Sequence, residues 1–417
     1  MRILIYSYNY HPEPIGIAPL MTELAEGLAK RGHEVRVVTA MPWYPASEIS
    51  PEYQGKLYLT EECNGVKIQR CYVHINGKRN LLNRVLFELS FVFLSFFQAL
   101  WGKRPDVIFL TIPGLPVAVP AAILSWIYQS PIILNLQDIL PDAAVHVGLI
   151  RNKTIIKLFQ YLEKFAYKTA TKISVIADGF TKNLLEKKVP LEKIIEIPNW
   201  VDINFIKPCS KSNNEFRLKN KLVGKFVVIY SGNIALTQPL EVLIDAAAKL
   251  KHILDIVIVI IGKEEALERL ERYRQRKKTD NVILRPFEPR EKLSEMLGAA
   301  DVGMVMQKSN VIAFNMPSKI QVLLASGRAI IGSVPPEGTA ARAIKQSGGG
   351  IVVCPENSKA LAAAIEQLYL NPDLVSRLGQ QGRQYAKQYY AFEATLDRYE
   401  ELLESVMQPS KKKHQLL

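Results

Sequence analysis

A short segment with a proline, a serine and a lysine in sequence is a candidate ligand-binding site. Met316-Pro317-Ser318-Lys319 ends a loop that begins at Gln307-Lys308, and a helical pattern starts at the same point. A helix start that bears a lysine and free backbone N–H groups suits a diphosphate. We therefore expect this segment, together with Lys308, to bind a negatively charged ligand.

Two further loops follow predicted strands and contain glycines. The first runs from Tyr10 to Pro19 and includes Gly16, and the second runs from Tyr230 to Pro239. Glycine lets the backbone approach a ligand closely, and the helix that follows offers unpaired N–H groups to phosphate. The candidate contacts in the second loop are Gly232, Asn233 and Gln238. Each loop alone could be an ordinary turn, so the prediction depends on their occurring together.

Two carboxylates follow the apolar run 132–135. Asp138 and Asp142 come after this predicted strand, at the edge of the sheet where ligands of such folds bind. Asp142 is the better candidate for a helix cap. Asp138 is the candidate catalytic carboxylate.

Several expected motifs are absent from the sequence. It has no GxxxxGK[ST], GxGxxG, HExxH or GxSxG, which argues against common NTPases, dehydrogenases, zinc proteases and serine hydrolases. The four cysteines are scattered at positions 63, 71, 209 and 354, so we expect free thiols and no metal site. No Asp-x-Asp pair occurs that could hold a metal-bridged diphosphate.

The net charge of +13 fits an anionic partner, which could be nucleic acid, an anionic lipid or a phosphorylated substrate. No zinc-finger or ribonucleoprotein motif is present, so nucleic acid is a minor possibility. The chain enters the apolar run 3–6 directly after Met1-Arg2, without the pattern of a signal peptide. We expect a cytoplasmic location.

Short β-branched runs alternate with helix-period segments, which predicts an α/β fold with parallel strands. The strands expected in the first half are 3–6, 34–39, 107–111, 132–135, 172–176 and 193–197. Those expected in the second half are 226–230, 256–261, 281–284, 302–306, 329–331 and 351–353. A helix is expected from Ala18 to Arg31, ended by Gly32.

The length of 417 residues and the repeated plan predict two doubly wound, Rossmann-like domains that face a central cleft. We expect the first domain over 1–205, a polar linker over 206–224 and the second domain over 225–385. Residues 386–417 should form a helix that packs back on the first domain and a basic tail with Lys411, Lys412 and Lys413.

Two segments of the first half suggest contact with a membrane surface. The segment Asn83 to Trp101 is almost entirely apolar, but Arg84, Glu88, Ser95 and Gln98 lie along one helical stripe. This polar stripe argues against a transmembrane helix. The segment is either a buried crossover helix or a helix inserted partly into the membrane interface. The residues that would touch lipid or an acceptor here are Arg84, Phe91, Phe96 and Trp101.

The second segment, Lys153 to Lys172, has lysines on one helical face and apolar residues on the other. The lysines are Lys153, Lys157, Lys164 and Lys168, and the apolar residues are Ile155, Leu158, Leu162, Phe165 and Ala166. The apolar face should pack on the sheet. The lysine face is either an ordinary solvated surface or a contact with anionic lipid, for which Lys153 and Lys157 are the first candidates.

Taken together, these motifs resemble the family 4 glycosyltransferases of the two-domain GT-B type, most closely the branch of colanic-acid-type exopolysaccharide assembly. The resemblance covers essentially the whole chain. The motifs that carry it are the turn with Gly16, Gly32-His33-Glu34-Val35, Gln137-Asp138, Pro198-Asn199-Trp200, Tyr230-Ser231-Gly232-Asn233-Ile234, Gln307-Lys308, Met316-Pro317-Ser318-Lys319 and Ala325-Ser326-Gly327-Arg328.

The resemblance implies a retaining sugar transfer from a nucleoside diphosphate sugar to a lipid-linked acceptor, without a metal or other cofactor. Gly16 and Ser318-Lys319 would hold the diphosphate, and Asp138 would lie near the reacting sugar. Gly262, Arg285 and Phe287, which follow strands of the second half, are predicted to contact the base. The enzyme would work at the inner face of the plasma membrane.

The sequence departs from the family pattern at four positions. Many members carry an Arg and a Lys where this chain has Asn233 and Gln238, and two glutamates where it has Phe314 and Val322. Lys319 and Lys308 would replace the lost positive charge. A catalytically inactive homologue that binds nucleotide or lipid in an assembly complex, and a nucleotide-sugar epimerase of the same fold, are the alternatives.

Overall fold

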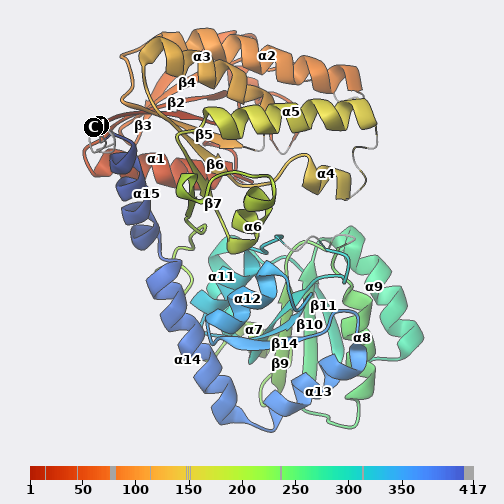
Figure 1. Ribbon diagram of the computed structural model, residues 1–417. Helices are drawn as coiled ribbons and strands as arrows, with labels where there is room; N and C mark the ends of the chain where they lie inside the picture. The colour runs from red at the N-terminus through yellow and green to blue at the C-terminus, as the bar shows by residue number, and fades with distance from the viewer. Residues whose placement is uncertain are drawn as a thin grey trace, which may run out of the picture. The chain divides into compact units, whose positions relative to one another are not determined.

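The computed structural model describes residues 1–407, apart from 15, 45, 76–80, 113, 147, 149, 151, 235–236 and 312–313. The chain forms two compact α/β units (Figure 1). The first contains Met1–Ile197 and the part of the last helix that starts at Leu396, and the second contains Pro198–Thr395. The α/β class with two Rossmann-like units is confirmed.

The first unit is built on an eight-stranded sheet of order β3-β4-β2-β1-β5-β6-β7-β8. Its strands are β1 Arg2–Tyr6, β2 Glu34–Ala40, β3 Tyr58–Cys63, β4 Val66–Cys71, β5 Val107–Ile112, β6 Ile132–Leu136, β7 Lys172–Val175 and β8 Ile194–Glu196. Its helices are α1 Ala18–Lys30, α2 Leu81–Leu100, α3 Ala118–Tyr128, α4 Asp142–His146, α5 Lys153–Thr169 and α6 Asp178–Glu186. Every neighbouring pair is parallel except β3 and β4.

The second unit has a six-stranded parallel sheet of order β11-β10-β9-β12-β13-β14. Its strands are β9 Phe226–Ser231, β10 Ile256–Gly262, β11 Val282–Pro286, β12 Val302–Met306, β13 Ala329–Ser333 and β14 Gly350–Val353. Its helices are α7 Glu215–Lys219, α8 Leu240–Lys249, α9 Glu264–Lys277, α10 Leu293–Gly298, α11 Lys319–Ala325, α12 Thr339–Gln346, α13 Ser358–Tyr369 and α14 Pro372–Tyr389. The strand order reverses between β9 and β12, as in doubly wound nucleotide-binding folds.

Each predicted strand is present, but the hairpin of β3 and β4 was not predicted. The two strands run antiparallel and meet at Asn64-Gly65, where φ is +51° and +80°. Asn-Gly is a strong signal of a two-residue hairpin, since both residues tolerate positive φ. The charged residues of the flanking segments hide the strand pattern, and the turn was the signal that could have revealed it.

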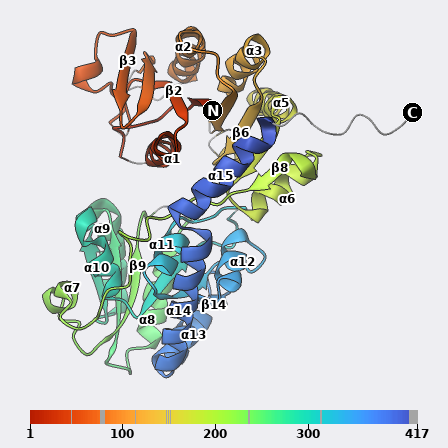
Figure 2. The same cartoon turned by 90° about the vertical axis from the view of Figure 1, so that its left-hand side faces the viewer.

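Helices cover both faces of the first sheet. Figure 2 shows α2, α3 and α5 in a row along one side of the sheet and α1 on the other. The last helix, α15 (Phe392–Met407), also belongs to the side of α1. Its Tyr399 packs edge-on against Phe109 of β5 and accepts a 2.9 Å hydrogen bond from Asn135 of β6. The tail with Lys411 to Lys413 lies outside the described residues.

The polar stretch 206–224 is part of the second unit. It contains α7, and Phe216 and Leu222 are buried in the core of that unit. The second unit begins earlier than the expected boundary at 205, because Val201 forms a bridge with Ala391 and Trp200 packs on Phe392.

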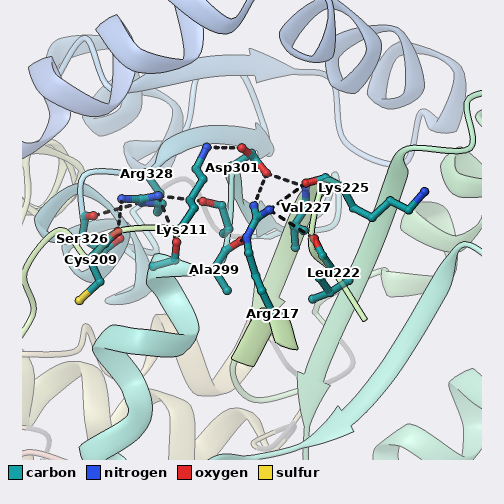
Figure 3. A network of polar contacts seen from close by, with 12 residues as sticks. Cys209, Lys211, Arg217, Leu222, Lys225, Val227, Ala299, Asp301, Ser326 and Arg328 are labelled. Carbon is teal, nitrogen blue, oxygen red and sulfur yellow. Dashed lines mark hydrogen bonds and ion pairs between the residues drawn. The ribbon is translucent and has the colours of Figure 1, made fainter. Parts of the chain in front are cut away.

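A buried ion network ties this stretch to the amino end of the second sheet (Figure 3). The carboxylate of Asp301 accepts hydrogen bonds from Arg217 Nη2 at 2.7 Å and from the backbone N–H of Val227 at 2.8 Å, and it also pairs with Lys211. Arg217 donates further to the carbonyls of Ala299 and Lys225. Because Arg217 and Asp301 are both buried, the charge of Arg217 depends on the Asp301 carboxylate for compensation.

Candidate functional site

A cavity of about 430 Å³ lies at the carboxyl end of the second sheet. It opens where β9 and β12 diverge, which is the usual ligand site of doubly wound sheets. Its lining residues are Ser231, Gly232, Asn233, Gln238, Leu293, Leu297, Met304, Asn315, Met316, Pro317, Ser318, Lys319, Val322 and Leu323. Leu293 and Leu297 come from α10, and Val322 and Leu323 come from α11, whereas the others belong to β9, β12 and the segments predicted to bind an anion.

Lys319 is the cation of this cavity. Its Nζ is shielded from solvent and has no hydrogen-bond partner among the residues that the structure describes. The ammonium lies 3.8 Å from the centre of the Tyr230 ring, at a distance typical of a cation–π contact. Burial lowers the pKa of Lys319 to about 7. A buried ammonium with no anion beside it is costly, so the cavity favours a negatively charged ligand.

Gly232 makes the room for this lysine. Its φ of +143° favours glycine, and a Cβ at this position would lie 3.0 Å from Lys319 Nζ. A side chain at position 232 would therefore compete with the lysine and with any ligand for the same space.

Hydrogen bonds order each loop of the cavity, and one of them joins the two loops. The Tyr230 hydroxyl donates to the carbonyl of Asn233 at 2.7 Å, and the Lys308 N–H donates to the carbonyl of Thr237 at 3.0 Å. Gln307 Nε2 donates to Asn315 Oδ1 at 2.8 Å. Both sides of the cavity are fixed by the ends of buried strands, while residues 235–236 and 312–313 lie outside the described part of the chain.

Some predicted site residues of the second unit meet in the cavity and others do not. Gly232, Asn233, Gln238, Met316, Pro317, Ser318 and Lys319 line it, whereas Lys308, Gly262, Arg285 and Phe287 are not among its lining residues. Gly262 packs under Ile234, whose side chain a Cβ at 262 would meet at 2.3 Å. Arg285 donates from Nε to Asn220 Oδ1 at 2.6 Å. A role of these residues at the base stays a prediction.

The predicted site residues of the first unit follow its strands as expected. Gly16 lies in the loop between β1 and α1 with φ +73°. Asp138 follows β6, accepts a 2.9 Å hydrogen bond from the N–H of Ile139, and has its pKa raised by burial. Asp142 pairs with Lys187 at 2.8 Å and accepts from Asn183. The described residues hold no group of three or more His, Cys, Asp and Glu side chains placed to bind a metal ion.

The predicted membrane residues need correction in part. Phe91 is fully buried against Tyr6 and Tyr8, so it cannot contact lipid or an acceptor. Phe96 is half-buried, Trp101 is largely exposed, and the side chain of Arg84 lies outside the described residues. None of the described helices has both the length and the apolar character needed to cross a bilayer.

Helix α5 also differs from the prediction. Lys153, Lys157, Lys164 and Lys168 are exposed as expected. Leu158 and Phe165, however, do not pack on the sheet but are exposed. The buried side of α5 holds Glu163, Ala166 and Tyr167. The Glu163 carboxylate is compensated there by Lys187 at 2.5 Å and by the Tyr167 hydroxyl at 2.9 Å.

Residues that sequence reasoning missed complete the cavity. Tyr230 lies beneath Lys319, and Asn315 lines the wall. Tyr230 has the pattern of an ordinary strand residue, so its role at the site could not be read from the sequence. Val322 was noted as a departure from the family, and the structure places its apolar side chain in the cavity.

A larger hollow, of about 1020 Å³, lies at the amino ends of the same strands. Lys211 pairs there with Asp301, Lys225 pairs with Asp255, and Arg328 and Arg383 donate to backbone carbonyls, while Lys387 is exposed to solvent. We therefore place the chemistry in the smaller cavity, where the buried ammonium is uncompensated.

Comparison with known proteins shows the family of the chain. Residues 16–200 match the model of the glycosyl transferase 4-like domain, and residues 212–385 match that of glycosyl transferases group 1. The chain is 31% identical over 383 residues to the putative colanic acid biosynthesis glycosyl transferase WcaI of Escherichia coli K12, covering 89% of this chain and 93% of that protein.

Solved structures share the fold. HepE of Anabaena, in complex with UDP, superposes with a TM-score of 0.71 at 15% identity and covers 97% of this chain and 100% of its own. Sucrose-phosphate synthase of Thermosynechococcus elongatus gives a TM-score of 0.72 at 17% identity, with 97% and 98% covered. The fold is that of the GT-B enzymes, and the chain belongs to the family 4 glycosyltransferases, in the branch that includes the colanic acid biosynthesis enzymes.

Proposed function

We propose that this glycosyltransferase moves a sugar from a nucleoside diphosphate donor to a lipid-linked saccharide at the inner face of the plasma membrane, with retention of anomeric configuration. The observation that carries the proposal is the uncompensated ammonium of Lys319 in the cavity of the second unit. A donor diphosphate would supply the missing negative charge. HepE, which has the same fold, was solved with UDP and is consistent with such a ligand.

In the proposed reaction, the bond between the anomeric carbon and the diphosphate oxygen breaks while the acceptor hydroxyl oxygen attacks from the same face. The hydroxyl proton passes to the leaving diphosphate. Lys319 stabilises the charge that develops on that diphosphate, which is the kind of effect that usually dominates catalysis. Asp138, whose pKa is raised by burial, is proposed to lie near the reacting sugar. The similarity to a putative colanic acid biosynthesis enzyme supports a lipid-linked acceptor.

A nucleotide-binding homologue without catalysis is the second candidate. Its support is Val322, because an apolar side chain lines the cavity where the family carries a glutamate, and Phe314, which is buried at the other glutamate position. The loss of these carboxylates removes expected contacts to the donor.

Titration with UDP and GDP, followed by a transfer assay, separates the two candidates. The purified protein should bind one of the two nucleotides in calorimetry, and it should incorporate labelled sugar into lipid-extractable material when membrane extract supplies the acceptor. Nucleotide binding without donor hydrolysis or transfer would favour the inactive homologue. Binding of neither nucleotide would contradict the donor site.

We expect transfer to continue in the presence of EDTA. The sequence has no Asp-x-Asp pair, and Lys319 offers a cation that can take the place of a divalent ion at the diphosphate. Initial rates measured with EDTA and with added manganese should agree within error. A loss of activity on chelation that manganese restores would contradict this charge assignment.

A further inference from the structure

Three polar side chains of helix α2 turn toward the sheet. Ser95 shares a hydrogen bond with the Tyr6 hydroxyl, and Glu88 accepts one from the Tyr8 hydroxyl. Gln98 Nε2 donates to the Arg70 carbonyl at 3.3 Å. These three polar residues of α2 are buried. A surface helix of a water-soluble protein normally shows the opposite polarity, with polar residues outward.

The outward side of α2 is apolar, and α3 continues the same surface. We name this surface the apolar helical face, and it consists of Leu82, Val85, Leu86, Leu89, Phe93 and Phe97 of α2 and Val119, Ile123, Trp126 and Ile127 of α3. Phe93 is 63% exposed and Trp126 is 75% exposed. The two helices lie side by side (Figures 1 and 2), and the Tyr128 hydroxyl of α3 donates to the Ala99 carbonyl of α2.

Charged side chains are missing from this surface over residues 85–100 and 118–128. The sequence of these ranges contains one charged residue, Glu88, and it is buried. Soluble monomers rarely expose a contiguous apolar patch of this kind, which marks a binding surface when it occurs.

The surroundings of the apolar helical face indicate what it binds. Helix α5, which packs beside α3, exposes Lys153, Lys157, Lys164 and Lys168. Tyr161 of α5 is also exposed, as is Trp101, which follows α2. Lysines attract anionic headgroups, and Trp and Tyr favour the boundary between acyl chains and headgroups.

We infer that the apolar helical face inserts into the interfacial region of the bilayer leaflet that it meets, while the lysines of α5 contact anionic headgroups. The inference adds a specific surface to the proposed function, and its test does not require sugar transfer. The net charge of +13 favours an anionic bilayer over a second copy of the same basic chain. Since the polar side of α2 is committed to the sheet, the helix lies along the membrane rather than across it.

Sedimentation with vesicles of phosphatidylcholine and phosphatidylglycerol tests the apolar contact. The full chain should pellet with the vesicles, and the triple variant Leu89→Gln, Phe93→Gln, Trp126→Gln should partition at least about tenfold less. The matched control is Val223→Gln, Leu254→Gln, Leu370→Gln, which changes three exposed apolar residues of the second unit. The control should pellet like the unchanged protein, and circular dichroism should show that all three proteins are folded.

Lipids brominated on their acyl chains give a direct readout of depth. They should quench the fluorescence of the unchanged protein, and Trp126→Phe should remove a large part of that quenching. Replacing the four lysines of α5 by Gln should weaken binding to vesicles with phosphatidylglycerol and reduce its salt dependence, with little effect on pure phosphatidylcholine.

Two outcomes would overturn the inference. In the first, the unchanged protein stays in the supernatant, or the triple variant pellets as the unchanged protein does. In the second, the unchanged protein forms a dimer that ignores vesicles and that the triple variant dissociates, which would make the face a self-association surface.

Discussion

Replacing Lys319 by alanine should lower kcat/KM for sugar transfer. The expected rise in activation free energy is about 2 to 4 kcal/mol. The loss is expected because, in the proposed reaction, the buried ammonium of Lys319 stabilises the leaving diphosphate in the cavity. Steady-state kinetics measure the effect, with Lys249→Ala as a control for an exposed lysine on α8. Because no carboxylate of the described residues pairs with Lys319, the variant should fold, and an unchanged kcat/KM would exclude Lys319 from the site.

The pH dependence of donor binding gives Lys319 a second signature. Burial lowers its pKa to about 7 in the empty cavity, whereas a bound diphosphate favours the ammonium and raises that pKa. Donor affinity should therefore be level below about pH 7 and fall above it, by up to about tenfold per pH unit. Calorimetry should show this fall in the unchanged protein and its absence in Lys319→Ala. A fall of equal size in both proteins would assign it to another group.

Replacing Asp301 by alanine should lower the free energy of unfolding of the second unit by about 3 to 5 kcal/mol. The change leaves Arg217 buried without its counterion, and it also removes the acceptor of the Val227 N–H. Urea denaturation followed by circular dichroism measures the shift of the midpoint at constant slope. Asp255→Ala is the matched control, since its pair with Lys225 is largely exposed and contributes less than about 1 kcal/mol.

A double variant tests the reason for that loss. Adding Arg217→Met to Asp301→Ala removes the uncompensated charge and leaves an apolar chain of similar length, so stability should partly return. If the double variant is less stable than Asp301→Ala alone, the buried charge is not the main cause.

The sequence was sufficient to predict the two Rossmann-like units and the loops that meet in the cavity. The loops with Gly232 and Lys319 could be predicted to meet because each follows a strand, and parallel strands bring their carboxyl ends to one edge of the sheet. Tyr230 could not be assigned in this way. Its ring supports Lys319 from β9, where Val227, Val228 and Ile229 are core residues, so Tyr230 has the sequence pattern of a buried strand residue.

Helix α2 shows the other limit. Its polar stripe was visible in the sequence, but the side that faces the sheet depends on partners far away in the chain. Tyr6 and Tyr8 offer hydroxyl groups to Ser95 and Glu88, and these bonds turn the stripe inward. Phe91 is consequently buried, while Phe93, on the same apolar helix, is exposed. The two phenylalanines thus differ in burial because of contacts with residues distant in the sequence.

The edges of both sheets bear on how this protein can aggregate. In the first unit, β3 carries Glu61 and Glu62, and β8 has three residues. In the second, β11 ends in Arg285 and Pro286, and β14 has four residues. Charge, proline and short length all discourage an edge from pairing with another chain. When the protein is concentrated without lipid, it should therefore associate through the apolar helical face, and mild detergent should reverse this association. Intermolecular β-structure should not form.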